Sequence, residues 1–212
     1  MNAVSISQNN LGYIIRQTLQ GESLGVVILK RIQELAQKSS GSANLLNAIE
    51  NQITDEMRHV KIYREMLLSG RFGHQHQLDR AWDKTLTILT QANIPLHILA
   101  IGVYGCIEPF NFEVVESLLL PQLSKSDFLI IKDVSADEKK HIDILDLFDD
   151  LFSKKLKNDE LVEAQKYTSD FCRTFLGGMS LPSGDSLTWS PDSKRNFLAH
   201  FRKLKNRIAH WT

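Results

Sequence analysis

Cysteine is nearly absent from this chain of 212 residues. The two cysteines, Cys106 and Cys172, stand far apart and form no C-x-x-C pair. Their number and spacing argue against a disulfide scaffold, a zinc ribbon and an iron–sulfur site. We therefore expect a reducing, cytoplasmic environment. The N-terminal residues have neither a basic flank nor an apolar signal core, and the apolar runs are interrupted, so we expect no membrane span.

Net charge is also lacking, because the chain has 25 basic and 25 acidic residues. No overall field therefore draws the chain to nucleic acid or anionic lipid. The segment from Pro191 onward is locally basic, with six Lys or Arg against one acid, Asp192. A solvated amphipathic helix explains this segment more simply than contact with RNA, a lipid surface or an acidic partner. A nucleic-acid partner is not expected.

Proline and strand-like alternation are scarce, and apolar residues recur at three- and four-residue spacing instead. This spacing predicts an all-α fold. We expect one domain over residues 1–212, with a four-helix bundle and a crossover helix in 10–152 and a C-terminal helical extension in 153–212. The expected helices span residues 10–38, 43–68, 76–92, 95–120, 127–152, 160–176 and 191 onward, with Ser42 as an N-cap and a loop through Ser186 before the last helix.

A five-residue motif occurs twice, each time in the middle of a predicted helix. The pattern D-E-x-[K/R]-H covers residues 55–59 and again residues 137–141. Positions three apart on a helix share a face, so the Glu and the His of each copy point together into the bundle. A buried carboxylate is costly unless it is neutralised, and a divalent metal ion removes that cost. The repeat thus offers four candidate ligands, Glu56, His59, Glu138 and His141.

Two more ligands are expected, because a two-metal bundle site takes one Glu from each of the other two helices. Measured from the intervening turn, Glu22 matches the level of Glu56, whereas Glu34 does not. By the same measure Glu108 matches Glu138. Four carboxylates would then balance two divalent ions. Mixed carboxylate and imidazole ligation favours iron, with manganese or a mixed Mn/Fe pair as alternatives, over zinc or magnesium.

Two tyrosines stand one helical turn from candidate ligands. Tyr63 follows His59, and Tyr104 precedes Glu108. Either phenol would suit a catalytic role as a redox or proton-relay group beside the metals. Ordinary core packing is the simpler interpretation of each.

Glycines cluster at the level of the expected metal site. They either leave a cavity for O2 and substrate or allow close helix approach, and both interpretations stay open. The four residues are Gly21, Gly25, Gly102 and Gly105. Pro109, directly after Glu108, cannot donate a hydrogen bond to the Gly105 carbonyl, so we expect a kink or bulge in this helix.

With these six ligands the chain resembles the ferritin-like di-iron carboxylate superfamily over residues 10–152. Its four helices carry, in order, Glu, Glu-x-x-His, Glu and Glu-x-x-His. Iron-storage ferritins generally lack the second Glu-x-x-His, so the resemblance favours oxygen-activating or peroxidase-type members. Size and spacing resemble small stand-alone families, such as the aldehyde-deformylating oxygenases or the tRNA-modifying hydroxylases of the MiaE type. By this resemblance, Asp55 and Asp137 would each hydrogen-bond the far nitrogen of a ligand histidine across the bundle and fix its tautomer.

The expected function is that of a dinuclear iron oxidase or oxygenase, with O2 as co-substrate and a small, largely apolar organic molecule as substrate. A ferredoxin, a reductase or the substrate itself would supply electrons. One alternative is peroxide or iron detoxification, as in rubrerythrin-like or manganese-catalase-like proteins, although rubredoxin-like cysteines are missing. Another is a non-enzymatic helical protein with a structural metal site. The sequence leaves the substrate and the assembly open, a homodimer included.

Overall fold

Helices make up almost all of the chain that the computed structural model describes, which confirms the all-α class. The described residues are 8–72, 87, 89–153, 155–176, 179–180, 186–187 and 189–211. The crossover helix expected at 76–92 lies mostly outside these ranges. Of its residues, Thr87 and Leu89 are helical.

The first helical hairpin consists of α1 (Gln8–Lys38) and α2 (Ala43–Leu68). Ser40, with φ 61°, ends α1 in the left-handed region. The Ser42 hydroxyl then accepts a hydrogen bond from the Leu45 N–H at 3.2 Å, so the predicted N-cap is confirmed. These local signals explain why the turn is short and why the two helices run antiparallel.

The third helical segment, Leu96–Gln122, is distorted at two places. Its parts are α4 (Leu96–Gly102), the π turn η1 (Val103–Ile107), α5 (Glu108–Val114), the π turn η2 (Val115–Leu119) and the 3-10 turn η3 (Leu120–Gln122). The bulge predicted beside Pro109 is therefore confirmed. In η1 the Glu108 N–H bonds to the Val103 carbonyl, five residues back, instead of four. The second π turn was not predicted.

The fourth helix differs from the predicted range 127–152 at both ends. It begins earlier, as α6 (Lys125–Leu147), because Ser124 is its N-cap and accepts a hydrogen bond from the Asp127 N–H. It also stops at Phe148, whose N–H bonds at 3.1 Å to the carbonyl three residues back, and a separate short helix, α7 (Asp149–Phe152), follows. The prediction of one continuous helix to residue 152 was therefore wrong.

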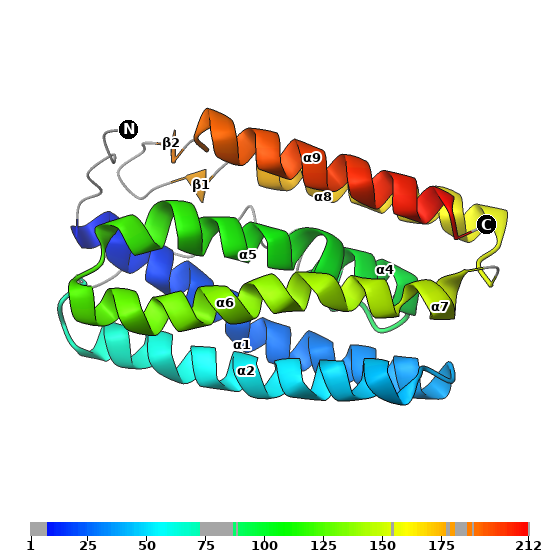
Figure 1. Ribbon diagram of the computed structural model, residues 1–212, viewed down its shortest axis with the longest axis horizontal. Coiled ribbons are helices and arrows are strands. Elements are labelled where there is room, and N and C mark those ends of the chain that lie inside the picture. The colour runs from blue at the N-terminus through cyan, green and yellow to red at the C-terminus, as the bar shows by residue number, and fades with distance from the viewer. Residues whose placement is uncertain are drawn as a thin grey trace.

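The four long segments lie side by side, and the C-terminal helices cover one side of them (Figure 1). These are α8 (Asn158–Leu176) and α9 (Pro191–Ala209), which pack on the third segment. Between them, the predicted loop contains a short antiparallel pair, β1 (Met179–Ser180) with β2 (Ser186–Leu187), a departure from the expected irregular loop.

The third segment is also the most apolar part of the described chain. By length and composition Leu96–Gln122 could cross a membrane, although Glu108, Glu113 and Glu116 interrupt its apolar run. It is the one candidate span among the described residues. However, 94% of its apolar window is buried, as is usual for the core helix of a soluble protein.

Gly12 and Gly21 offer a paired test of packing along α1. A Cβ at Gly12 would overlap the backbone carbonyl oxygen of Phe72, whereas a Cβ at Gly21 would meet no atom within 4 Å. We expect Gly12→Ala to lower the free energy of unfolding by about 1–3 kcal/mol. We expect Gly21→Ala to raise it by up to about 1 kcal/mol, because Ala favours the helix. Urea denaturation measures both, and equal effects would contradict the close contact at Gly12.

Candidate metal centre

All six predicted ligands meet in the core of the bundle, one or two from each long segment. They form two groups, and in each group the candidate donor atoms lie within 4.8 Å of one another. The first group is Glu22, Glu56, His59 and Glu138, and the second is Glu56, Glu108, Glu138 and His141. All six side chains are buried. Because Glu56 and Glu138 belong to both groups, the arrangement suits two ions that share two carboxylates.

Each histidine lies closest to the glutamate of the other motif. His59 Nδ1 is 3.2 Å from Glu138 Oε1, and His141 Nδ1 is 3.2 Å from Glu56 Oε1. The lone glutamates of α1 and α5 follow at 3.6 and 3.8 Å from the same two nitrogens. The two motifs therefore interlock across the interface between α2 and α6, with approximate two-fold symmetry.

Seven polar atoms of this cluster are buried without a hydrogen-bond partner among the described residues. They are both carboxylate oxygens of Glu22 and of Glu138, Oε2 of Glu108, and Nδ1 of His59 and of His141. Buried polar atoms normally have partners, so such a concentration needs an explanation. These atoms carry lone pairs and face one another, and a cation between them would satisfy all of them. The residues present therefore fit a pair of metal ions.

The pKa shifts in the cluster also indicate that it attracts cations. Burial and the neighbouring carboxylates raise the pKa of Glu22 and of Glu138 well above the ordinary value. Burial opposes a charge on His141, but the neighbouring carboxylates of Glu108 and Glu56, 3.8 and 3.2 Å from Nδ1, outweigh it and raise the pKa to about 11. Burial is likewise outweighed at Glu56, where the neighbouring Glu22 and His141 lower the pKa to about 2. Without a metal, a proton on His141 partly neutralises the carboxylates.

The aspartates of the two motifs lie where the resemblance placed them, across the bundle from their own histidines. Asp137 Oδ2 is 3.6 Å from His59 Nε2, and Asp55 Oδ2 is 3.5 Å from His141 Nε2. A carboxylate beside Nε2 favours the proton on that nitrogen, which leaves Nδ1 free to bind a metal.

Asp137 is held by two cationic side chains. Arg58 forms a short ion pair with it, and Lys140 Nζ lies at 2.8 Å. Burial raises the pKa of Asp137, but the hydrogen bond and charge of Lys140 outweigh it and lower the pKa below the ordinary value. Arg58 Nη2 is also 3.3 Å from His59 Nε2, a contact that would favour the opposite tautomer. A metal at Nδ1 selects the tautomer that Asp137 supports, because a metal-bound nitrogen carries no proton.

Gln52 is part of the centre but was not among the predicted residues. It is 1% exposed, and its Nε2 donates to Glu108 Oε1 at 2.8 Å and to Glu56 Oε1 at 3.3 Å. The signal in the sequence was its position one turn before Glu56, on a stripe that is otherwise apolar. Gln52 therefore links Glu56, which belongs to both ligand groups, to Glu108, which belongs only to the second.

Tyr63 and Tyr104 are both 0% exposed, and their hydroxyls have no hydrogen-bond partner among the described residues. Burial raises the pKa of each phenol, and nearby carboxylates, Glu22 for Tyr63 and Glu108 for Tyr104, raise it further. The raised pKa values favour the protonated form of both phenols. A redox or proton-relay role stays a prediction.

The four glycines divide between the two interpretations that the sequence left open. A Cβ at Gly102 or Gly105 would meet Leu89 or Leu204 side chains at 2.6 and 2.8 Å, so these two glycines permit close packing. Gly21 and Gly25 instead line a cavity beside the ligands. Its volume is ≈ 20 Å³, and its other lining residues are Ile28, Glu56, Val103, Ile107, Glu108 and Asn111. Such a space holds a molecule about the size of one water.

Comparison with known proteins adds no relatives. No protein-family profile matches the chain, and no curated protein or solved structure is significantly similar to it. The interpretation of the centre therefore rests on its own residues, which form buried carboxylate and histidine groups that could hold metal ions.

The overlap of the two ligand groups predicts graded losses of metal. We expect two ions per chain, one ion after Glu22→Gln or Glu108→Gln, and none after Glu138→Gln, because Glu138 belongs to both groups. The control is Glu34→Ala, an exposed position on the same helix as Glu22 that should keep both ions. Elemental analysis after expression with iron gives the count, and equal losses in all four variants would show that the grouping is wrong.

Removal of the metals should reverse the pH dependence of stability. Between about pH 7.5 and 8.5, where His59, His97 and His200 with their lowered pKa values are largely deprotonated in both states, the metal-free folded chain binds more protons than the unfolded chain, because the pKa of His141 is raised to about 11 and those of Glu22 and Glu138 are also raised. Its free energy of unfolding should therefore fall as the pH rises. The metal-loaded protein should become more stable over the same interval, since ligation requires deprotonated ligands. Thermal melts with and without a chelator test this, and parallel slopes would contradict it.

Proposed function

We propose that this chain is a dinuclear iron oxidoreductase of the ferritin-like di-iron carboxylate superfamily. In this proposal it uses O2 to oxidise a small, largely apolar organic substrate. The observation that carries the proposal is the pair of four-residue ligand groups that share Glu56 and Glu138. The order of ligands along α1, α2, α5 and α6 supports the superfamily assignment.

The ligand set favours iron within the proposal. Four carboxylates and two imidazoles match the preference of iron or manganese, and four negative charges balance two divalent ions. When bound, a pair of Fe(II) ions supplies electrons that reduce O2. In an oxygenation, one oxygen atom of O2 would be inserted into a C–H bond of the substrate and the other would leave as water. This reaction needs two further electrons, which a ferredoxin or reductase would supply, and two protons, which would come from solvent.

The protein's own residues would orient the ligands and move protons. Asp55 and Asp137 keep a proton on the Nε2 atoms of the histidines, and Gln52 holds one oxygen of Glu108. The phenol of Tyr63 or Tyr104 could give up a hydrogen atom to the buried cluster, because burial and the nearby carboxylates raise its pKa and favour the protonated form. The apolar walls around the centre exclude bulk water.

Peroxide or Fe(II) detoxification is the second candidate, and the cavity favours it. A space of ≈ 20 Å³ holds about one water, so hydrogen peroxide or O2 would need less rearrangement to enter than a larger molecule would. A larger organic substrate would require the side chains around this cavity to move. The same ligands would serve either reaction, so reactivity must distinguish them.

Stopped-flow mixing of the anaerobic Fe(II)-loaded protein with O2 or with hydrogen peroxide tests the proposal. We expect rapid consumption of O2 and oxidation of the iron in the wild type. Glu138→Gln, which removes the charge of a carboxylate common to both groups, should slow the reaction by more than the roughly 10–100-fold that loss of a residue supporting a metal ligand costs. Lys132→Ala, an exposed position on the same helix, is the control.

The outcome separates the candidates. Fast reaction with peroxide and negligible reaction with O2 would move the assignment to detoxification. Two bound ions without reaction toward either oxidant would indicate a structural metal site. Unaltered oxidation in the Glu138→Gln variant would show that iron reacts elsewhere on the protein.

A further inference from the structure

The carbonyl group of Gly105 lies in the π turn directly before the candidate ligand Glu108. In a regular helix it would accept a hydrogen bond from the residue four positions on. That residue is Pro109, which has no N–H to donate. The Glu108 N–H is engaged elsewhere, on the Val103 carbonyl. The Gly105 carbonyl therefore lacks its usual helical donor.

His200 of α9 supplies a donor to this carbonyl. Its Nε2 lies 2.9 Å from the oxygen of Gly105, 95 positions away in the sequence. A carbonyl oxygen can only accept, so the proton of the ring must be on Nε2. Burial lowers the pKa of His200 despite this hydrogen bond, which keeps the imidazole neutral near pH 7.

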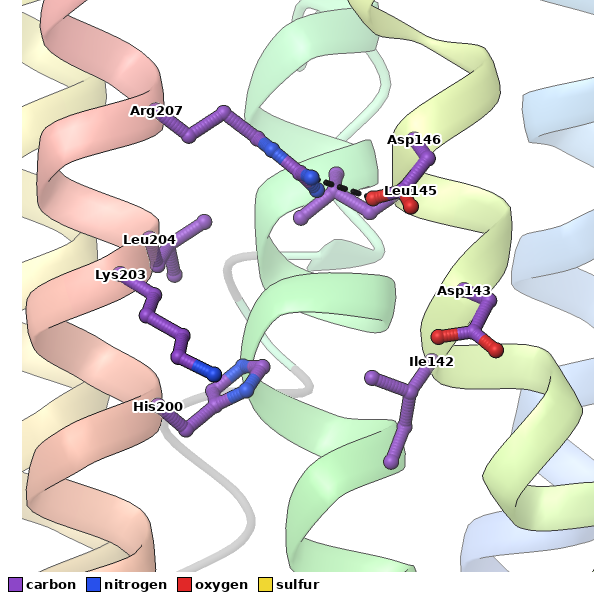
Figure 2. Close-up of a pocket in the computed structure, with 8 residues that line it drawn as sticks. All are labelled: Ile142, Asp143, Leu145, Asp146, His200, Lys203, Leu204 and Arg207. Carbon is purple, nitrogen blue, oxygen red and sulfur yellow. Dashed lines mark hydrogen bonds and ion pairs between the residues drawn. The ribbon is translucent and has the colours of Figure 1, made fainter.

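The helix that carries His200 is fixed against the bundle on the C-terminal side of this contact. Leu204, one turn further along α9, packs directly on Gly105, where a Cβ would come within 2.8 Å of it. Arg207 forms an ion pair with Asp146 of α6 (Figure 2). Figure 2 also shows the His200 ring pointing from α9 into the cleft between α9 and α6, in front of the third segment. The packing of α9 thus holds the His200 imidazole in place, and the imidazole in turn holds the Gly105 carbonyl.

We propose that His200 is a positioning residue for Glu108: by capping the Gly105 carbonyl it holds the π turn that directs the Glu108 carboxylate toward the metal centre. This inference rests on the proposed dinuclear centre. It assigns the C-terminal extension a part in metal binding, although none of its described residues belongs to either ligand group.

The proposal makes an asymmetric prediction, because Glu108 belongs to one ligand group only. Without the imidazole, the Gly105 carbonyl in the π turn loses its hydrogen-bond donor, and the Glu108 side chain is no longer held in one orientation. The group of Glu56, Glu108, Glu138 and His141 should then bind its ion more weakly. The group that contains Glu22 keeps all of its ligands and should bind as before.

Mn(II) titration of the full chain, followed by electron paramagnetic resonance, tests this. In His200→Ala we expect one ion bound as in the wild type and a second bound about tenfold or more weakly, the size of effect that residues supporting metal ligands have. His200→Gln, which keeps an N–H donor, should recover part of the affinity. His97→Ala is the control: His97 is a histidine of α4 that is 3% exposed, and it precedes the π turn in the third segment.

Two results would overturn the proposal. One is wild-type affinity for both ions in His200→Ala, and the other is an equal loss of the second ion in His97→Ala, which would indicate general destabilisation. If the wild type binds no Mn(II) or Fe(II), the proposed function itself fails. Amide hydrogen exchange in the metal-free protein then decides the structural part: faster exchange of the Glu108 amide in His200→Ala, but not in His97→Ala, supports it, and equal exchange contradicts it.

Discussion

The repulsion among four buried carboxylates is the constraint on which the rest of this bundle depends. Each long segment places one glutamate at the same level of an apolar core, where like charges cannot be left without compensation. Two imidazoles and Gln52 supply only part of that compensation, as the unpartnered oxygens of Glu22 and Glu138 indicate. The remaining need for positive charge is the physical reason to expect metal ions between the helices.

Helical periodicity explains how much of this centre could be predicted from the sequence. The repeated motif fixes Glu56 and Glu138 on inward faces, and counting residues from Ser42 places Glu22 at the level of the first motif. Both steps use only the regular rise of a helix, so they hold where the helices are regular. Gln52 could not be found in this way, because one polar residue on an apolar stripe has no spacing pattern of its own.

The irregular parts of the fold were less predictable for the same reason. Pro109 indicated a distortion, but its form as a π turn depends on which carbonyl each N–H reaches. The sequence could not show whether each glycine leaves a cavity or allows close packing, because the answer depends on its neighbours in space. Leu204 packs on Gly105, whereas no atom lies near the Cβ position of Gly21. The break at Phe148 likewise could not be predicted, because no proline or glycine stands near it in the sequence.

These irregularities divide the bundle into two unlike halves. The hairpin of α1 and α2 is regular and carries its ligands on continuous helices, whereas the third segment carries Glu108 between two π turns and depends on α9 for support. The small cavity lies between these halves, with Gly21 and Gly25 on the regular side and Val103 and Ile107 of the π turn on the other. Because π turns hold fewer regular hydrogen bonds than an α-helix, the second side is the one that can yield to a substrate. We therefore expect the third segment and the helix that covers it to set the size of the molecule that can reach the candidate metal centre.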